Sequence, residues 1–255
     1  GKIDESTMFP LGDLETIKKE LRVNILCGTP VKRLRARERV LELDGGRGRQ
    51  YDDIIIATGA GAVIPPIKNL PERGIYTMRT ASDARRLERA LNGVKSAVVV
   101  GAQMVGIKVV ELLVKRGIRT VLCDMERQMF PASAYERTAA VIAGRLERAG
   151  VELRLGAAIT GVSDSGKVLS ASFSDGSETS ADLIVFCSGI RPNIAFVDRE
   201  EIDVGVGIKT DLHMRASVPH IYAAGDCCET CSPLTGKNAY IGLWANSAMQ
   251  GRVAG

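Results

Sequence analysis

The stretch "SAVVVGAQMVGIKVVELLVKRGIRTVLCDMERQ", residues 96–128, decides the fold. Its apolar run 97–100 is typical of a buried strand, and residues 104–116 carry apolar side chains at helical spacing until Gly117 can end the helix. A second strand, residues 120–124, follows at once. A strand, a crossover helix and a second strand make a βαβ unit, so the stretch predicts an α/β fold with parallel strands.

The turn between the first strand and the helix carries two of the three glycines of a dinucleotide-binding loop. Gly101 would make the tight turn and Gly106 would let the helix pack closely, whereas Gln103 stands where glycine normally admits the pyrophosphate. The helix N-terminus would present amides and a positive dipole end to phosphate. These residues predict a nucleotide site, and Gln103 keeps open the alternative of a Rossmann-type layer whose site has lapsed.

An acidic residue closes the same unit. Asp124, at the end of the second strand, could accept hydrogen bonds from the ribose hydroxyls. Asp124 and Glu126 would repel a 2′-phosphate, which favours NAD over NADP, although Arg127 follows them directly.

Composition excludes several classes of protein. The 255 residues are 45% hydrophobic and carry a formal charge of +4, with basic residues mixed among acidic ones, so no nucleic-acid partner is expected. The longest apolar runs have the length of strands and the N-terminus lacks an apolar signal segment, so no membrane partner is expected. Cys27, Cys123 and Cys187 lie inside apolar runs and indicate core thiols of a reducing compartment, which places the protein in the cytoplasm.

The order of elements indicates an inserted domain. Residues 79–205 alternate strands and helices, whereas residues 1–78 and 206–255 do not complete a domain separately. The first of these segments holds strand-like runs "RVNIL", "VKRL" and "RVLEL", and the last ends in a helix predicted from about Leu243. A host domain split by residues 79–205 explains this layout better than two domains in tandem.

Four motifs in a fixed order resemble a known family. They are "DIIIATGA", "VVVGAQMVG" with "VLCDMER", "DLIVFCSGIRPN" and "IYAAGD". In this order they resemble the FAD-dependent pyridine nucleotide-disulfide oxidoreductases over nearly the whole chain. Lys108 and the ending "LWANSAMQGRVAG" are most similar to the NAD(FAD)-dependent dehydrogenases related to the nitrite reductase large subunit. The resemblance implies two Rossmann-like domains, an NAD-binding domain of residues 79–205 inserted into a partial FAD-binding domain of residues 1–78 and 206–255.

The resemblance also implies the cofactor-binding residues. Those expected near FAD are Ala57, Thr58, Gly59 and Asp226, and those expected near NAD are Gly101, Gln103, Gly106, Asp124 and Gly189. No catalytic side chain is singled out, because hydride transfer from NADH to the flavin needs no protein nucleophile. No metal is expected.

The implied activity is that of a flavoprotein oxidoreductase that takes hydride from NADH and serves a second acceptor, a small molecule or a redox protein. A homodimer is left open. Members of the family begin with an FAD-binding glycine loop, and none precedes Ile3, so this chain alone is expected to bind FAD poorly. A nucleotide-binding or interaction module without turnover is the alternative.

Three smaller features have open interpretations. Cys227, Cys228 and Cys231 could form a metal or redox site, although a thiol-rich loop is the simpler interpretation. Lys108 stands where many members have glutamate, and it either steadies charge near the nicotinamide or is a solvated helix residue. Trp244, the only tryptophan, could pack near the flavin or belong to a core or interface.

Overall fold

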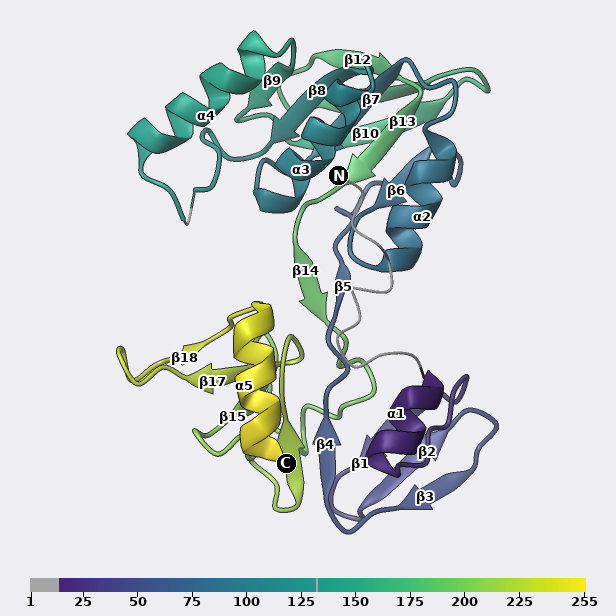
Figure 1. The fold of residues 1–255 in the computed structure, drawn as a ribbon, viewed down its shortest axis with the longest axis vertical. Helices are drawn as coiled ribbons and strands as arrows, with labels where there is room; N and C mark the ends of the chain where they lie inside the picture. Colours follow the sequence, from purple (N-terminus) through teal and green to yellow (C-terminus); the bar gives the residue numbers. More distant parts are fainter. Residues whose placement is uncertain (1–13, 132) are drawn as a thin grey trace. The chain divides into compact units, whose positions relative to one another are not determined.

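The structure, a computed structural model, describes residues 14–131 and 133–255. The chain divides into two compact units (Figure 1): unit 1 takes residues 1–57 and 194–255, and unit 2 takes residues 58–193. These borders lie earlier in the chain than the expected ones after residues 78 and 205. Strand pairing sets the first border, and the burial of residues after 193 in unit 1 sets the second. That one unit binds FAD and the other NAD stays a prediction.

Unit 2 is built on a parallel sheet of five strands in the order β6-β13-β7-β8-β9. Its strands are β6 (Ile75–Thr77), β7 (Ser96–Val100), β8 (Arg119–Asp124), β9 (Glu152–Leu155) and β13 (Leu183–Phe186). Because β6 pairs in parallel with β13, residues 58–78 belong to this unit and not to the first. The predicted βαβ stretch supplies β7, α3 (Met104–Lys115) and β8, and β7 pairs in parallel with β8.

Other elements cover both faces of this sheet. Both faces of β7 are therefore buried, and its sequence is a continuous apolar run. Ala97 and Val99 point into a core shared with the helices, which are α2 (Ala81–Ala90), α3 and α4 (Glu136–Arg148). Val98 and Val100 point into a second core under the antiparallel meander of β10 (Ile159–Asp164), β11 (Leu169–Phe173) and β12 (Glu178–Ala181). Unit 2 therefore has three layers, helices, parallel sheet and meander, which confirms the predicted α/β class.

A short antiparallel ribbon also belongs to unit 2. It pairs β5 (Ala60–Ala62) with β14 (Ile190–Pro192), so residues soon after the first motif lie beside residues of the third.

Unit 1 is assembled from the two ends of the chain. Its first part holds α1 (Leu14–Leu21), an antiparallel sheet of β1 (Val31–Arg35), β2 (Val40–Leu43) and β3 (Gly48–Gln50), and then β4 (Ile54–Ile56). Its second part holds β15 (Ile208–Thr210), β16 (Ile221–Ala223), β17 (Cys228–Cys231), β18 (Asn238–Ala239) and α5 (Trp244–Ala254). The two parts meet where β4 pairs in parallel with β16.

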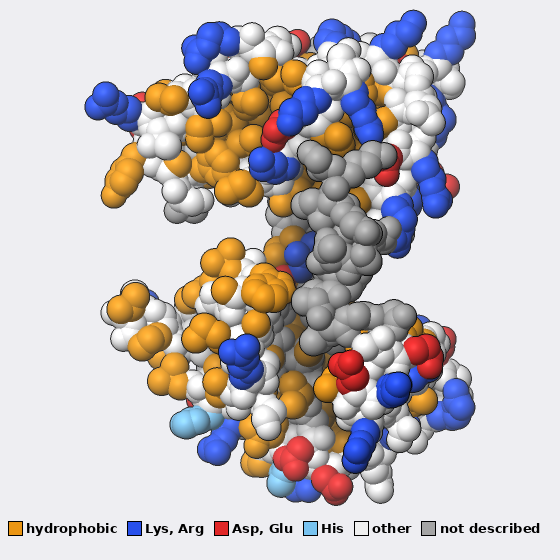
Figure 2. Space-filling model, in the orientation of Figure 1, with side chains coloured by type: hydrophobic (Ala, Val, Ile, Leu, Met, Phe, Trp, Pro, Cys, Tyr) orange, Lys and Arg blue, Asp and Glu red, His pale blue; other side chains and the backbone are white. Residues whose placement is uncertain are grey.

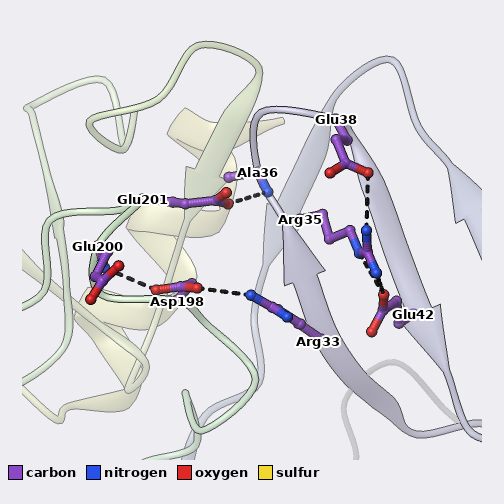
Figure 3. A network of polar contacts seen from close by, with 8 residues as sticks. All are labelled: Arg33, Arg35, Ala36, Glu38, Glu42, Asp198, Glu200 and Glu201. Carbon is purple, nitrogen blue, oxygen red and sulfur yellow. Dashed lines mark hydrogen bonds and ion pairs between the residues drawn. The ribbon is translucent and has the colours of Figure 1, made fainter.

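Polar contacts join the same two parts around β1 (Figure 3). The Arg33 guanidinium lies 3.1 Å from the Asp198 carboxylate, and the Ala36 amide donates a 2.8 Å hydrogen bond to Glu201. Arg35 pairs within the sheet with Glu42 and Glu38. Ile194, Val197 and Ile202 are buried in the core of unit 1 with Leu34, so residues 194–205 belong to this unit.

One expected strand is absent. Residues 22–26, "RVNIL", form no strand, and Arg22 adopts a left-handed φ of 52°. Val23 and Leu26 are exposed, so the apolar run lacks a pairing strand in the described part of the chain. Two helices begin close to the residues predicted for them: α4 begins one residue after Tyr135, and α5 begins one residue after Leu243.

Candidate functional site

The carboxyl edge of the unit 2 sheet brings three predicted residues together. Strands β13, β7 and β8 are neighbours in the sheet, and Gly189, Gly101 and Asp124 lie at or just beyond their carboxyl ends. The amide of Gly101 donates to Cys123 O at 2.8 Å, and the amide of Cys187 donates to Val100 O at 2.7 Å, which holds the three strand ends side by side. Ligands of open α/β sheets bind at this edge.

The two loop glycines are required by packing alone. Gly101 has φ +112°, and a methyl group there would collide with the carbonyl oxygen of Cys187. A methyl group on Gly106 would collide with the carbonyl oxygen of Gly101, because α3 crosses the turn at closest approach. Both glycines therefore allow close packing inside the loop, and the side chain exposed at the start of α3, where a pyrophosphate would approach, is that of Gln103.

Gln103 occupies the N-cap position of α3 without acting as a cap. Its φ and ψ are −111° and −173°, its side chain makes no capping hydrogen bond, and it is exposed. This extended conformation suits any residue, so glutamine costs no backbone strain. The amides of the first turn have no carbonyl partner within the helix, as at every helix start.

Asp124 is tied to the glycine loop. Its Oδ2 accepts a 2.6 Å hydrogen bond from the amide of Ala102, and its Oδ1 accepts a 3.0 Å hydrogen bond from the amide of Glu126. A carboxylate offers about four acceptor positions, so both oxygens can still accept hydroxyl donors. The arrangement fits a ribose, whose adjacent hydroxyls would donate to this half-buried group.

A hollow of about 590 Å³ lies directly beyond Asp124, between the residues after β8 and the first half of α4. Its wall is apolar at Met125, Ala139, Ala143 and Leu155 and polar or charged at Glu126, Arg127, Gln128 and Glu136. Figure 2 shows hydrophobic side chains gathered on the face of unit 2 that carries α3 and α4. Met104 and Met125, both in this unit, are 64% and 70% exposed. An apolar, open hollow beside a ribose acceptor suits a flat aromatic base.

Lys108 contacts another residue of its own helix, α3. Its ammonium lies 3.0 Å from the Glu111 carboxylate, which Lys115 also contacts at 2.7 Å, and the Lys108 side chain is 70% exposed. The two lysines lower the pKa of Glu111 to about 2. These contacts favour the solvated-helix interpretation of Lys108.

The residues predicted near FAD lie in part at the carboxyl end of β4 and β16. The amide of Ala224 donates to Ile56 O at 3.0 Å, so Ala57 and the turn of Gly225 and Asp226 follow two adjacent parallel strands. Within unit 1 the structure therefore brings Ala57 and Asp226 to one sheet edge.

Helix α5 and Tyr240 hold the Asp226 turn, a role that the sequence did not reveal. Ser247 Oγ donates to Asp226 Oδ1 at 3.3 Å, and Gln250 Oε1 accepts a 2.9 Å hydrogen bond from the amide of Gly225. The Tyr240 hydroxyl donates to Asp226 O at 3.2 Å. Trp244, at the first position of α5, is 77% exposed, so it is not a core residue of unit 1 as described.

Thr58 and Gly59 begin unit 2, and both contact Asn193. The Thr58 hydroxyl donates to Asn193 O at 2.8 Å, and Asn193 Nδ2 donates to Thr58 O at 3.0 Å. The amide of Asn193 donates to Gly59 O at 2.9 Å, and Gly59 has φ +65°. Asn193 is the last residue of the third motif, and no sequence pattern marks it as a site residue.

The cysteines after the Asp226 turn do not assemble a metal site. Cys227 Sγ lies 3.2 Å from Ile56 O and 3.2 Å from Ala224 O, and burial raises the pKa of Cys228 to about 12. Among the described residues there is no group of three or more His, Cys, Asp or Glu side chains that could hold a metal ion. In the same residues no helix is long and apolar enough to span a membrane.

The fold and the sheet-edge geometry define an α/β protein of the Rossmann type with a second, split unit. Residues 4–251 match the family described as pyridine nucleotide-disulphide oxidoreductase, and the chain belongs to this family.

Three relatives illustrate the match. The NADH oxidase of Methanocaldococcus jannaschii is 29% identical over 94% of this chain and 55% of its own length. The NAD-dependent persulfide reductase of A. fulgidus is 27% identical, with a TM-score of 0.87 over 94% of this chain and 46% of its own. The water-forming NADH oxidase of Lactobacillus brevis, solved with NADH, shares the fold at 24% identity, with a TM-score of 0.92 over 99% of this chain and 57% of its own. The chain thus spans about half the length of the relatives that it matches.

Proposed function

We propose that this chain belongs to an NADH-dependent flavoprotein oxidoreductase, which transfers hydride from NADH to FAD and then electrons to a separate acceptor. The observation that carries the proposal is the convergence of Gly189, Gly101 and Asp124 at the carboxyl ends of three adjacent strands. Family membership supports it, because the named relatives include an NADH oxidase and an NAD-dependent persulfide reductase.

In unit 2 we assign NADH to this edge. The loop from Gly101 to Gly106, with the Gln103 side chain moved aside, and the first amides of α3 would hold the pyrophosphate, and Asp124 would hold the adenosine ribose. The adenine would lie in the apolar hollow beside Met125 and α4. A negative Asp124 disfavours a 2′-phosphate, which is why we propose NADH rather than NADPH.

In unit 1 we assign Ala57 and Asp226 to FAD, together with the Thr58 and Gly59 turn that follows Ala57. Asp226 would accept hydrogen bonds from the hydroxyls of the flavin side, and Gln250 and Ser247 would keep its turn in place. When bound, the flavin supplies the hydride-accepting chemistry, and the chain supplies binding and orientation.

We propose that the electron acceptor is a small molecule or a redox protein, separate from the part of the chain that the structure describes. Burial raises the pKa of Cys123, Cys187 and Cys228 to about 12, so these thiols are poor candidates for an internal disulfide relay.

Two measurements on the purified full-length protein test the proposal. Visible flavin absorbance that bleaches on anaerobic addition of NADH is the expected result. Calorimetric titration with NADH reports the nucleotide site separately. A colourless protein that binds NADH would support a module without turnover, and no heat at millimolar ligand would refute the NADH site.

A further inference from the structure

The turn proposed to contact the flavin is held by a single residue far along the chain. Thr58 Oγ1 donates to Asn193 O at 2.8 Å, Asn193 Nδ2 donates to Thr58 O at 3.0 Å, and the Asn193 amide donates to Gly59 O at 2.9 Å. Side chain and backbone therefore bond in both directions between residues 135 positions apart. No sequence pattern within either segment predicts this pairing.

The Asn193 side chain is chemically suited to this place. Its Nδ2 faces the carbonyl oxygen of Thr58, and its Oδ1 lies 3.2 Å from the position that a methyl group on Gly61 would take. An aspartate would set a carboxylate oxygen against the Thr58 carbonyl, and an alanine would leave that carbonyl without its side-chain donor. Only an amide supplies a donor here in a side chain of this length.

Apart from Asn193, few contacts hold the turn of Thr58 and Gly59 in its conformation. Thr58 is exposed, and Gly59 adopts a left-handed φ of +65° with no atom near the position of an added methyl group. The space on that side of Gly59 is open, and the turn is connected to the rest of unit 2 by its hydrogen bonds to Asn193 and, at the next residue, by a 3.1 Å hydrogen bond from Arg79 Nε to Ala60 O. Such a turn is ordered by few contacts and is sensitive to the loss of one.

The same ribbon is fastened separately at its other end. Ser188 Oγ donates to Val63 O at 2.8 Å, and the amide of Val63 donates to Gly189 O at 3.0 Å. Between the two ends, β5 pairs with β14 through Ala60 to Ala62. A change at Asn193 thus acts on the Thr58 end, and a change at Ser188 acts on the Gly189 end.

We propose that Asn193 is a positioning residue for flavin binding, and that its side-chain amide holds the turn of Thr58 and Gly59 in the conformation that the flavin contacts. This inference rests on the proposed function, because the flavin contact of the turn is part of that proposal. Asn193 acts through the turn and is not a catalytic residue.

The test compares Asn193→Ala with Ser188→Ala, which removes a side-chain bond of the same kind at the opposite end of the ribbon. Asn92→Ala, an exposed asparagine of unit 2, controls for the substitution itself. Three quantities are measured on the full-length protein: the FAD dissociation constant by flavin fluorescence, the NADH dissociation constant by calorimetry, and the thermal unfolding midpoint. Hydrogen exchange of a peptide covering residues 54–63 is followed in each variant without cofactor.

For Asn193→Ala we expect FAD to bind roughly five- to tenfold more weakly, since one hydrogen bond and the order that it imposes are lost. The NADH constant and the unfolding midpoint should stay at parent values, and the peptide should exchange faster. Ser188→Ala and Asn92→Ala should leave the FAD constant unchanged. This split separates positioning from a general loss of stability.

Two results would overturn the inference while the proposed function stands. One is unchanged exchange of the peptide in Asn193→Ala, and the other is faster exchange with an unchanged FAD constant. If the parent itself binds no FAD, the proposed flavin function is wrong, and the inference falls with it. That failure is visible in the parent before any variant is compared.

Discussion

The Asp124 carboxylate accepts a 2.6 Å hydrogen bond from the backbone amide of Ala102, a residue of the glycine loop that begins α3. The end of β8 is thereby fixed to the turn after β7, and one side chain has both a structural role and a proposed ligand role. Any change at Asp124 must be judged on both.

Asp124→Asn keeps the size of the side chain, removes its charge and replaces one of its two backbone acceptors with a donor. We expect NADH to bind about tenfold more weakly, because hydrogen bonds from the ribose to a charged acceptor are stronger than those to an amide. The ratio of NADPH to NADH affinity should rise, since the repulsion of a 2′-phosphate is removed. Calorimetric titration with both nucleotides measures this. Glu88→Gln removes one charge from the exposed helix α2 and should change neither constant; parent-like selectivity in Asp124→Asn would contradict the ribose assignment.

Gln103→Gly addresses the residue that departs from the glycine pattern. Its exposed side chain makes no capping bond and is free to move aside, so we expect the NADH dissociation constant to change by less than about threefold. Gln103→Glu should weaken NADH binding roughly tenfold, because a carboxylate at the start of α3 would repel the pyrophosphate. Binding that tightens tenfold or more in Gln103→Gly would show that glutamine obstructs the site.

Gly101→Ala tests whether packing alone demands glycine in the loop. The added methyl group would meet the Cys187 carbonyl in a backbone conformation at φ +112°, so we expect a loss of about 3 kcal/mol in the free energy of unfolding. Gly117→Ala is the matched control, since its φ is +71° and the space around it is open, and it should cost about 1 kcal/mol. Chemical denaturation measures both. Equal losses would mean that the collision with Cys187 is relieved at no cost.

The cysteines offer a test of the metal and redox alternative. Burial raises the pKa of Cys123, Cys187 and Cys228 to about 12, so at pH 8 only about one thiol in ten thousand is ionised. We expect iodoacetamide to label the exposed Cys27 rapidly and these three only after denaturation, as read by mass spectrometry. Rapid labelling of Cys228 in the folded protein would contradict this expectation and support a redox role for the loop after Asp226.

The sequence by itself determined the βαβ unit, because strand and helix periodicities are local and Gly106 packs against the carbonyl of nearby Gly101. The collision that excludes a methyl group at Gly101 is with Cys187, which only the tertiary structure shows. The sequence also placed Asp124 at a strand end, and the order of four motifs identified the family. Residues 22–26 pair with no strand among residues 14–131 and 133–255, and no local pattern in a sequence says whether a strand has a partner.

Only the tertiary structure decided how distant segments meet. It set the division of the chain at residues 57 and 193, through the pairing of β6 with β13 and the burial of Ile194 and Val197 in unit 1. It also revealed Gln250 beside Gly225 and Asn193 beside Thr58, polar contacts between residues 25 and 135 positions apart. Such contacts depend on the topology of the sheets, which brings strand ends together from any distance in the chain, whereas a sequence pattern records only what neighbouring residues require of one another.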